Sequence, residues 1–445
     1  MEKNPFNTQL TELERAFIGK YTENGDIAFS STGDRMLDIL FMTEYYSKHL
    51  NEVKCEKDPL WALFSMFIRD PRKGLGKRDL GRAMMHQVAL SPELIAFAGR
   101  FDDLFINPTG NGVASKNLDY LKSEIMNGNN LAKKWAPRYS STKGEIAAIL
   151  AKRWGLNKRD YSKLVKCDTT ERRLTEHKAD TIKFEHVPSL ALLKYNRRFA
   201  TGEDSSELYA KFLEEVKNGR KKINASVTTC YDLYKKWKND TTIDCDLFWE
   251  ALPKVQGSWL PIIDTSGSMF DSNDSIGKAL SIGHYLAKTS TYCPDQAITF
   301  GSRPRLIDIT GLDYRSAMKK LEYSSDCTNT NLGRVMELLG NSLHNEFPEY
   351  LMIMSDMEFD WGSSASKDEV MQLWKERGYK TKIIWWNFNA RSKTVPETDD
   401  YGNIFLSGYN PTLLGLLESG FDSKKFLCKL LSEYYLYIEK SINQK

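Results

Sequence analysis

Few residues in this chain of 445 could cross-link it or bind zinc. The seven cysteines are an odd number, are scattered along the sequence and form no C-x-x-C pair. The six histidines are equally dispersed and lack the H-E-x-x-H spacing found in many zinc proteases. These absences argue against a disulfide framework and against a zinc site, and they favour a reducing compartment.

Long apolar runs are missing as well. No run reaches the roughly 20 residues that a membrane-spanning helix needs. The first residues, Met1–Pro5, do not lead into the apolar segment of a signal peptide. No Ser-His-Asp or Cys-His spacing indicates a nucleophilic catalyst. We therefore expect a cytoplasmic binding protein and not an enzyme.

The net charge is small, at +3, but it is unevenly distributed. Residues 1–252 hold 41 basic and 35 acidic side chains, whereas the remainder holds 21 and 24. Within the first part, the segment from Lys133 to Arg198 has 17 basic and seven acidic residues. Solvated helix faces are one explanation of this excess. An excess of this size is also typical of a surface that binds an acidic polymer, usually nucleic acid.

The hydrophobic pattern changes along the chain, and the length favours two domains. Residues 1–252 have helical spacing almost throughout, with expected helices at 78–90, 114–126, 143–154, 157–165, 170–180, 188–199, 205–217 and 225–237. Beyond them, strand patterns at 258–263, 296–300, 304–308, 350–355 and 381–387 alternate with helical patterns at 274–289, 313–322, 330–343, 366–376, 410–418 and 422–438. This order predicts an α + α/β fold, with an all-helical domain over 1–252 and a doubly wound, mostly parallel sheet domain over 253–445.

The most informative string is Asp264-Thr265-Ser266-Gly267-Ser268, which follows the apolar run 259–263. A buried parallel strand that ends in D-x-S-x-S delivers one carboxylate and two hydroxyls to a single loop. All three groups are hard oxygen ligands that suit Mg²⁺ or another divalent cation such as Mn²⁺. Asp and Ser also favour turns and helix N-caps, so the string alone is compatible with a purely structural loop.

Two later elements favour the metal interpretation, because binding groups of open α/β sheets lie on loops at the carboxyl ends of strands. Asp326–Leu332 opens a predicted helix, with Thr330 as the preferred hydroxyl and Thr328 as a competing one. Asp356 follows a second buried-strand pattern at 350–355. The order resembles the metal-ion-dependent adhesion site of von Willebrand factor A domains. That resemblance implies a Rossmann-like domain with one cation bound by Asp264, Ser266, Ser268, Thr330 and Asp356.

Several strings in the first half occur together in a known helical module. They are Arg69-Asp70, Gly74-Leu75-Gly76-Lys77-Arg78-Asp79, Gly99-Arg100-Phe101-Asp102-Asp103-Leu104, Ala132-Lys133-Lys134-Trp135-Ala136-Pro137 and Val187-Pro188-Ser189. They resemble the TROVE module of the Ro autoantigen family, and more closely its relatives that pair this module with a C-terminal von Willebrand A domain. The resemblance implies a ring of HEAT-like helical repeats. It also implies binding of the single-stranded ends of misfolded small RNAs, and of small non-coding RNAs.

The basic segment supplies residues for such a role. Lys and Arg attract phosphates, and the interleaved aromatic residues could stack on unpaired bases or pack between helices: Trp135, Trp154, Tyr161 and Tyr195. We expect RNA to contact Lys133, Lys134, Arg138, Lys152, Arg153, Lys158 and Arg159. Further cations that could face a phosphate backbone are Arg69, Arg72, Lys73, Lys77 and Arg78. The alternative is a protein-interaction scaffold, viral or phage-encoded, whose metal captures a partner's carboxylate.

Overall fold

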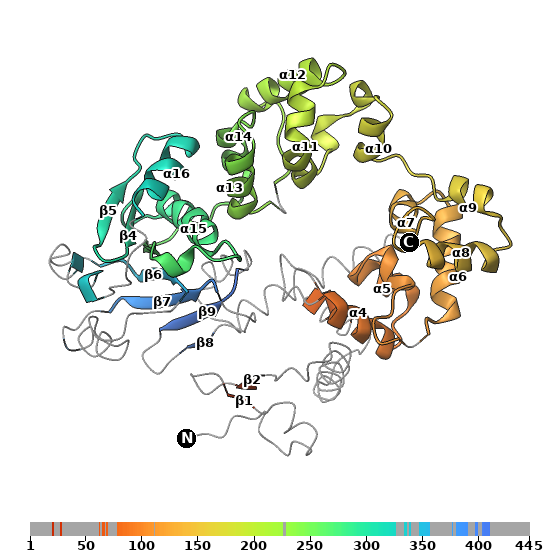
Figure 1. The fold of residues 1–445 in the computed structure, drawn as a ribbon, viewed down its shortest axis with the longest axis horizontal. Coiled ribbons are helices and arrows are strands. Elements are labelled where there is room, and N and C mark those ends of the chain that lie inside the picture. Colours follow the sequence, from red (N-terminus) through yellow and green to blue (C-terminus); the bar gives the residue numbers. More distant parts are fainter. Residues whose placement is uncertain are drawn as a thin grey trace. The chain divides into compact units, whose positions relative to one another are not determined.

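The structure is a computed structural model that describes residues 78–325 apart from 111, 226 and 227, together with 347–356, 380–389 and 403–409. It also describes the strand positions 20–21, 27–28 and 397–398 and the helical positions 62, 65–66, 68–69, 333–335, 338–339 and 376. The chain divides into two compact units, the first comprising residues 1–169 together with 428–445 and the second residues 170–427. The described part of the first unit is helical apart from the strand pair β1 (Lys20–Tyr21) and β2 (Ile27–Ala28), as Figure 1 shows. No described helix is long and apolar enough to cross a membrane.

Short capped helices build the first unit. Their bounds are α4 Arg78–Gln87, α5 Pro92–Ala98, α6 Ser115–Met126, α7 Asn130–Trp135, α8 Gly144–Arg153 and α9 Lys158–Leu164, with the 3-10 turn η2 Phe101–Leu104. Ser91, Asn129 and Asn157 cap α5, α7 and α9 by accepting hydrogen bonds from backbone N–H groups of the first turn. The apolar faces meet in one core. The predicted helices that correspond to α4, α6, α8 and α9 are confirmed, whereas α5 and α7 were not expected.

A buried charge network joins α4 to η2. The Nε and Nη2 atoms of Arg82 donate to Asp103 at 2.5 Å and to Asp102 at 2.9 Å. Arg69 Nε lies 2.7 Å from Asp103 Oδ2. Both carboxylates are at most 2% exposed, and buried carboxylates need such partners because burial without them is costly. Arg69 is itself only 8% exposed, so the expectation that it faces a phosphate backbone is wrong.

The second unit holds further helices and the sheet. The helices are α10 Thr170–Thr175, α11 Ser189–Thr201, α12 Ser206–Lys217, α13 Cys230–Asn239, α14 Cys245–Ala251, α15 Ser275–Thr289 and α16 Tyr314–Tyr323. The strands are β3 Trp259–Asp264, β4 Gln296–Phe300, β5 Arg305–Asp308, β6 Tyr350–Ser355, β7 Lys382–Asn387, β8 Glu397–Thr398 and β9 Ile404–Ser407. The predicted helices at 366–376, 410–418 and 422–438 lie outside the described residues, apart from helical Glu376.

The sheet of the described residues has the strand order β5-β4-β3-β6-β7-β9-β8. The inner strands β4, β3, β6, β7 and β9 run parallel, and β5 and β8 pair antiparallel at the two edges. A mostly parallel sheet is therefore confirmed. The parallel order places the carboxyl ends of β3 and β6 at one edge, which is where binding groups collect in open α/β sheets.

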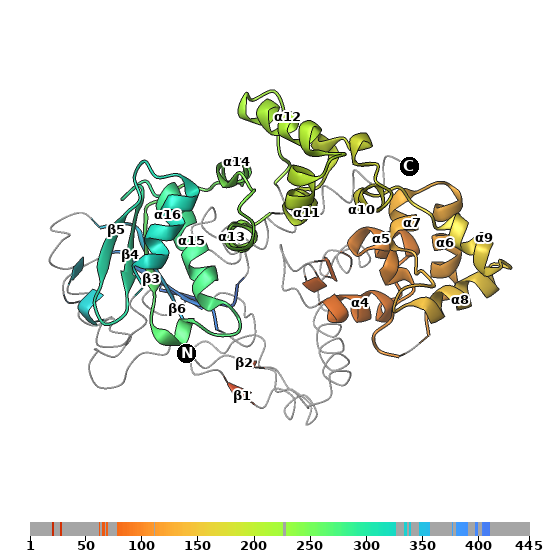
Figure 2. The same ribbon diagram turned by 45° about the horizontal axis from the view of Figure 1, so that its top comes forward.

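Alternating side chains cover the two faces of this sheet. One set, which includes Ile263, Met352 and Met354, shares a core with α15. The other set, which includes Ile262 and Ile353, packs with the helical residues Val335 and Leu339. Helix α15 packs across β3, β4 and β6, and α16 packs beside α15 (Figures 1 and 2). The described residues thus bury both faces, as a parallel sheet requires.

Packing in the second unit crosses the boundary predicted at 252/253. Helices α11 to α14 share one core with β3 and α15. The Tyr285 hydroxyl on α15 donates to the Pro253 carbonyl oxygen at 3.1 Å. The predicted domains 1–252 and 253–445 therefore follow the change from helices to strands, between α14 and β3, and not the division in packing.

Candidate functional site

The first candidate site lies at the carboxyl ends of β3 and β6. These strands pair in parallel with Ile263 opposite Met354, so Asp264 and Ser355 end them side by side. The Ser355 hydroxyl donates to Asp264 Oδ2 at 2.6 Å. The backbone N–H of Ser266 donates to Asp264 Oδ1 at 2.9 Å. The Asp264 carboxylate is therefore fixed by groups from both strands.

The next loop turn brings the two serines of D-x-S-x-S together. Ser266 precedes the 3-10 turn η5 (Gly267–Met269), and the Ser266 and Ser268 hydroxyl oxygens lie 3.2 Å apart. Asp356 follows Ser355 directly and is 5% exposed. Thr330 and its competitor Thr328 lie outside the described residues. The structure thus gathers Asp264, Ser266 and Ser268 in one loop; the convergence of all five predicted ligands on a cation stays a prediction.

Electrostatics at Asp264 are unusual for a carboxylate. Burial raises its pKa to about 6, hydrogen bonds from Ser355 and Ser266 oppose that rise, and the charge of Asp356 adds to it. Asp264 is fully buried, and it forms no ion pair with a Lys or Arg of the described residues. Buried charges in proteins are usually paired or bound to a metal, so this donor set fits a divalent cation.

Hydroxyls would have to complete such a site. Within the described residues, no cluster of three or more His, Cys, Asp and Glu side chains could hold a metal. Asp264 and Asp356 provide two carboxylates, and Ser266 and Ser268 provide the neutral oxygens. Sequence reasoning missed Ser355 as the partner of Asp264. The signal was its place as the last residue of β6, opposite the end of β3.

The loop that carries the serines continues to α15 and contacts α13. Phe270, two residues after Ser268, is 50% exposed. Asp274 precedes α15 with a left-handed backbone, at φ 55°. Its carboxylate accepts a hydrogen bond of 2.8 Å from the Tyr231 hydroxyl on α13. We call residues 264–274 the serine loop.

The second candidate site is the predicted RNA surface of the first unit. Its seven cations lie on α7, on the connection to α8, on α8 itself and on α9. Lys133 is partly buried and the other six are exposed. Arg153 pairs with Asp119 at 2.9 Å, and it is the only one of the seven to form an ion pair with a described residue. We call the seven residues the basic surface: Lys133, Lys134, Arg138, Lys152, Arg153, Lys158 and Arg159.

The aromatic residues of this region divide into two groups. Trp154 and Tyr161 are buried and stack with their ring centroids 5.6 Å apart, so they pack between helices and cannot receive a base. The Arg100 guanidinium lies 3.8 Å from the centroid of the partly buried Trp135, and the Lys134 ammonium lies 5.9 Å from it. Lys158 lies 5.3 Å from the Tyr139 ring. Trp135 and Tyr139 are therefore partly buried rings that lie beside cations.

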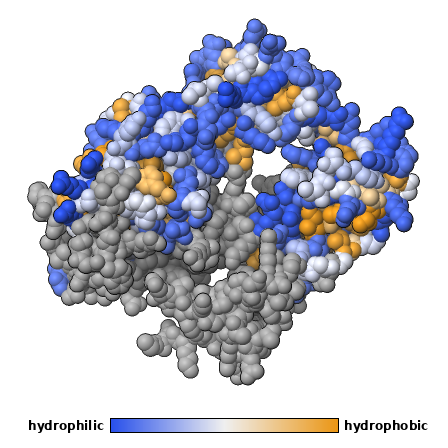
Figure 3. All heavy atoms as spheres, viewed as in Figure 1, coloured by the Kyte–Doolittle hydropathy of each residue, from blue (hydrophilic) through white to orange (hydrophobic). Residues whose placement is uncertain are grey.

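Two further cations near this surface were not predicted. Arg100 and Lys143 both pair with the buried Asp102, at 3.0 and 3.3 Å, while part of each side chain stays exposed. The sequence carried little signal for Lys143, because Asp102 lies 41 residues away in the chain. On the face visible in Figure 3, hydrophilic residues surround an apolar area over the helices of the first unit. Among the residues of this unit that the structure describes, the large apolar side chains that are exposed are Met126, Leu131 and Ile149.

Family models match two segments of the chain. One, described as a domain of unknown function (DUF7788), matches residues 258–429. The other, also a domain of unknown function (DUF2828), matches residues 158–254. The two matches meet between β3 and α14, where the helical pattern gives way to the sheet.

Proteins from a virus and a bacterium align with most of this chain, and a mussel protein aligns with part of it. An uncharacterized protein, L728, of Acanthamoeba polyphaga mimivirus is 24% identical over 507 aligned residues, covering 94% of this chain and 88% of that protein. The crystal structure of the Deinococcus radiodurans RO (RSR) protein aligns with a TM-score of 0.42 and 13% identity, over 92% of this chain and 95% of that one. Proximal thread matrix protein 1 of the mussel byssus aligns with a TM-score of 0.27 and 14% identity, over 38% and 48%. The chain is thus similar along most of its length to a viral protein that is itself uncharacterised.

Proposed function

We propose that this protein binds single-stranded RNA through the basic surface of its first unit. The observation that carries the proposal is the charge on that surface. Six of its seven cations have no acidic partner among the described residues. Elsewhere, exposed lysines such as Lys217 and Lys238 pair with Asp244 and Glu322. Cations without carboxylate partners remain available to phosphates, and each phosphate contact releases counterions from RNA.

The surrounding chemistry supports a single strand as the ligand. Trp135 and Tyr139 lie beside cations, and such rings can stack on unpaired bases. A base-paired RNA helix keeps its bases stacked inside and offers mainly phosphates and ribose hydroxyls. The resemblance of the first half to the TROVE module points the same way. We therefore expect RNA with an unpaired end to compete better than a blunt duplex of equal charge.

Charge neutralisation tests the surface. Replacing Lys133, Lys134 and Arg138 with glutamine should weaken RNA binding and reduce the slope of log affinity against log salt by about 2, since each single-strand phosphate contact contributes roughly 0.7. The matched control replaces Lys217, Lys238 and Lys254 with glutamine. Carboxylates already neutralise these three lysines, so the salt slope should not change. Equal effects of both triple variants would show that binding depends on net charge and not on this surface.

We further propose that Asp264, Ser266, Ser268, Thr330 and Asp356 bind one divalent cation, Mg²⁺ or Mn²⁺, in a non-catalytic role. The buried Asp264 carboxylate without a cationic partner among the described residues supports this. A bound cation would supply an open coordination position that a carboxylate or phosphate oxygen of a partner could fill. The residues of this chain would fix the cation, with Ser355 and the Ser266 backbone orienting Asp264.

Thermal unfolding with and without Mg²⁺ tests the cation site. A ligand that binds only the folded state raises the melting temperature by mass action, and about 2.7 kcal/mol is gained at 100 times Kd. Asp264→Asn keeps the shape of the side chain but removes its charge, so the Mg²⁺-dependent shift should disappear. Asp308→Asn, at an exposed position on β5, is the control and should keep the shift. A shift that survives in Asp264→Asn would place the responsible ion elsewhere.

A protein-interaction scaffold is the second candidate function, and Phe270 favours it. This large apolar side chain on the serine loop is half exposed, two residues from Ser268. A partner that offers a carboxylate to the cation could bury the Phe270 ring at the same time. Phe270→Ser should then weaken partner binding and leave both the Mg²⁺ response and RNA binding unchanged. Loss of RNA binding in Phe270→Ser would instead place RNA on the second unit.

A further inference from the structure

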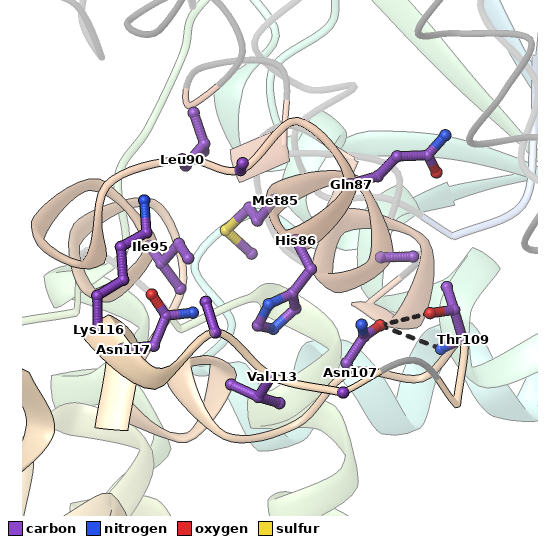
Figure 4. Close-up of a pocket in the computed structure, with 14 residues that line it drawn as sticks. Met85, His86, Gln87, Leu90, Ile95, Asn107, Thr109, Val113, Lys116 and Asn117 are labelled. Atoms are coloured by element: carbon purple, nitrogen blue, oxygen red, sulfur yellow. Dashed lines mark hydrogen bonds between the residues drawn. The ribbon is translucent and has the colours of Figure 1, made fainter. Parts of the chain in front are cut away.

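Two features of the molecule lie outside the sites proposed above: a cavity in the first unit and an edge of the sheet in the second. The cavity has a volume of about 570 Å³ and is lined by α4, α5, α6 and the segment 107–114, as Figure 4 shows. Two of its polar side chains bond to the chain itself: His86 Nε2 donates to the Asp103 carbonyl oxygen, and Asn107 Oδ1 accepts from Thr109. The backbone at the edge of the sheet differs, because part of it bonds to no described residue.

Strand β5 forms one edge of the sheet, and its pairing with β4 determines which of its backbone groups face outward (Figure 1). In an antiparallel pair, alternate residues direct both their N–H and their C=O to the neighbouring strand. The N–H of Ile309, just beyond β5, donates to the Asp295 carbonyl oxygen at 2.8 Å. Ile307 therefore also faces β4, whereas Leu306 and Asp308 direct their N–H and C=O groups away from the sheet.

Leu306 is the open point of this edge. Neither its N–H nor its C=O bonds to a described residue, and its side chain is 56% exposed. At one end of the strand, Lys320 on α16 donates to the Asp308 carbonyl oxygen, and at the other end Pro304 has no N–H. An antiparallel partner strand would exchange two hydrogen bonds with Leu306 and place an apolar side chain beside it.

The charges along this edge favour an acidic partner. Arg305 and Lys320 are exposed, and neither forms an ion pair with a described residue. Arg305 shares its face of the sheet with Ile307, which packs against the core that includes α15. Helix α16, which carries Lys320, packs beside α15. Both cations therefore lie on the same face, where a carboxylate on the partner strand opposite Arg305 would be attracted to them.

We propose that β5 binds an extended segment of a partner protein by strand addition, with an apolar residue opposite Leu306 and an acidic residue opposite Arg305. Main-chain hydrogen bonds supply the affinity in this mode of recognition, and alternate side chains supply the specificity. Proteins usually block exposed edges with charges or proline, but the outward backbone of Leu306 stays open between Pro304 and Asp308. Strand β5 carries no residue of the basic surface or of the cation site, so this binding is independent of both.

A labelled peptide of the sequence Thr-Val-Val-Glu-Thr-Glu is the probe, and fluorescence anisotropy measures its affinity for the full chain. In the antiparallel register, its second valine lies opposite Leu306 and its first glutamate lies opposite Arg305. A methyl group on the backbone nitrogen of the second valine removes the N–H that faces the edge. Binding should then weaken about threefold to tenfold, as expected for the loss of one hydrogen bond. The same methyl group on the first glutamate, whose N–H points away from β5, is the matched control and should have little effect.

Substitutions on β5 test the same contact from the protein side. Leu306→Pro removes the outward N–H, and edge strands accept proline where the N–H faces solvent. The melting temperature should therefore be kept, while the affinity for the peptide should fall at least threefold. Leu306→Val keeps the N–H and is the control. Arg305→Gln should weaken binding of the probe but not of a peptide with glutamine in place of both glutamates.

Each result supports or overturns strand addition at β5. A loss of affinity confined to the valine-methylated peptide and to Leu306→Pro supports it. No binding at about 1 mM peptide, equal effects of the two methyl groups, or full binding by Leu306→Pro would overturn it. If Leu306→Pro lowers the melting temperature, the two methylated peptides still decide, because they leave the protein unchanged. Sedimentation of the chain alone tests a second copy as the occupant, and a dimer that Leu306→Pro dissociates would overturn the assignment to a partner protein.

Discussion

His284 on α15 should make the second unit sensitive to acid. The side chain is 1% exposed, and neither ring nitrogen has a hydrogen-bond partner. The aromatic rings of Trp249 and Tyr314 contact it edge-on, with centroid distances of 4.6 and 4.9 Å. Burial lowers its pKa to about 3, and the positive charges of Lys288 and Lys254 add to the effect.

Proton linkage gives the sign and the size of the change in the free energy of unfolding with pH. The unfolded chain takes up the His284 proton near pH 6.5, whereas the folded chain does so only near pH 3, so the free energy of unfolding falls as the pH drops through this window. At 1.36 kcal/mol per pKa unit, the loss is about 2 kcal/mol at about pH 5 and about 5 kcal/mol when both states are protonated. The same group contributes no loss above about pH 7.

His284→Leu isolates this effect, because leucine has a similar volume and does not titrate. Denaturant unfolding of both proteins at about pH 7.5 and about pH 5 should show that the wild type loses about 2 kcal/mol more than the variant. All other titrating groups cancel in this difference. At neutral pH the variant should be at least as stable as the wild type, since two unsatisfied polar atoms are removed. Equal losses in both proteins would refute a neutral, buried His284.

Three further substitutions test the packing of each unit. Arg82→Leu should lower the free energy of unfolding of the first unit by about 3 to 5 kcal/mol, because it leaves Asp102 and Asp103 buried with fewer partners. Urea unfolding measures this loss, and a loss below about 1 kcal/mol would contradict a buried network. Tyr161→Phe removes the 3.0 Å hydrogen bond to the carbonyl oxygen of Pro137 and should cost about 1 kcal/mol, with RNA affinity unchanged because the ring is buried. Gly283→Ala would place a Cβ against the Ile263 side chain. The resulting overpacking should destabilise the fold by about 1 to 3 kcal/mol, which outweighs the gain of about 1 kcal/mol from the helix preference for alanine. A higher melting temperature in this variant would refute the close packing.

The sequence predicted the elements whose pattern is local. The strand at 350–355 agrees with β6, and the strand at 296–300 agrees with β4, because each is a short apolar run bounded by polar residues. Strand β9 was not predicted. It has four residues, and its pairing with β7 depends on tertiary contacts that include the Asn403 side chain, whose Oδ1 accepts from the Ile383 N–H at 3.0 Å.

The same contrast between local patterns and tertiary contacts applies to the residues of the candidate sites. The D-x-S-x-S string was predictable because all its oxygens lie within five residues. Ser355 was missed because its contact with Asp264 depends on strand register. Trp154 and Tyr161 could not be assigned from spacing alone, since an aromatic residue between basic ones can face the core or the solvent. The structure places both of them in the core.

The sequence pattern also could not predict where the chain divides into its two units. Helices α10 to α14 look like a continuation of the first 169 residues, because helical spacing does not reveal which core a helix joins. Trp249 and Trp237 pack in the same core as the strands. The boundary in packing therefore falls between Thr169 and Thr170, although the change in secondary structure comes after α14.

The central claim is that the cations of the first unit bind RNA, and photo-crosslinking tests it most directly. The full chain is irradiated with a single-stranded RNA that carries photoreactive bases, and the crosslinked peptides are identified by mass spectrometry. We expect crosslinks within residues 130–164, from α7 to α9, and their loss in the variant with glutamine at Lys133, Lys134 and Arg138. Crosslinks confined to residues 170–427, or none at low salt, would contradict the claim.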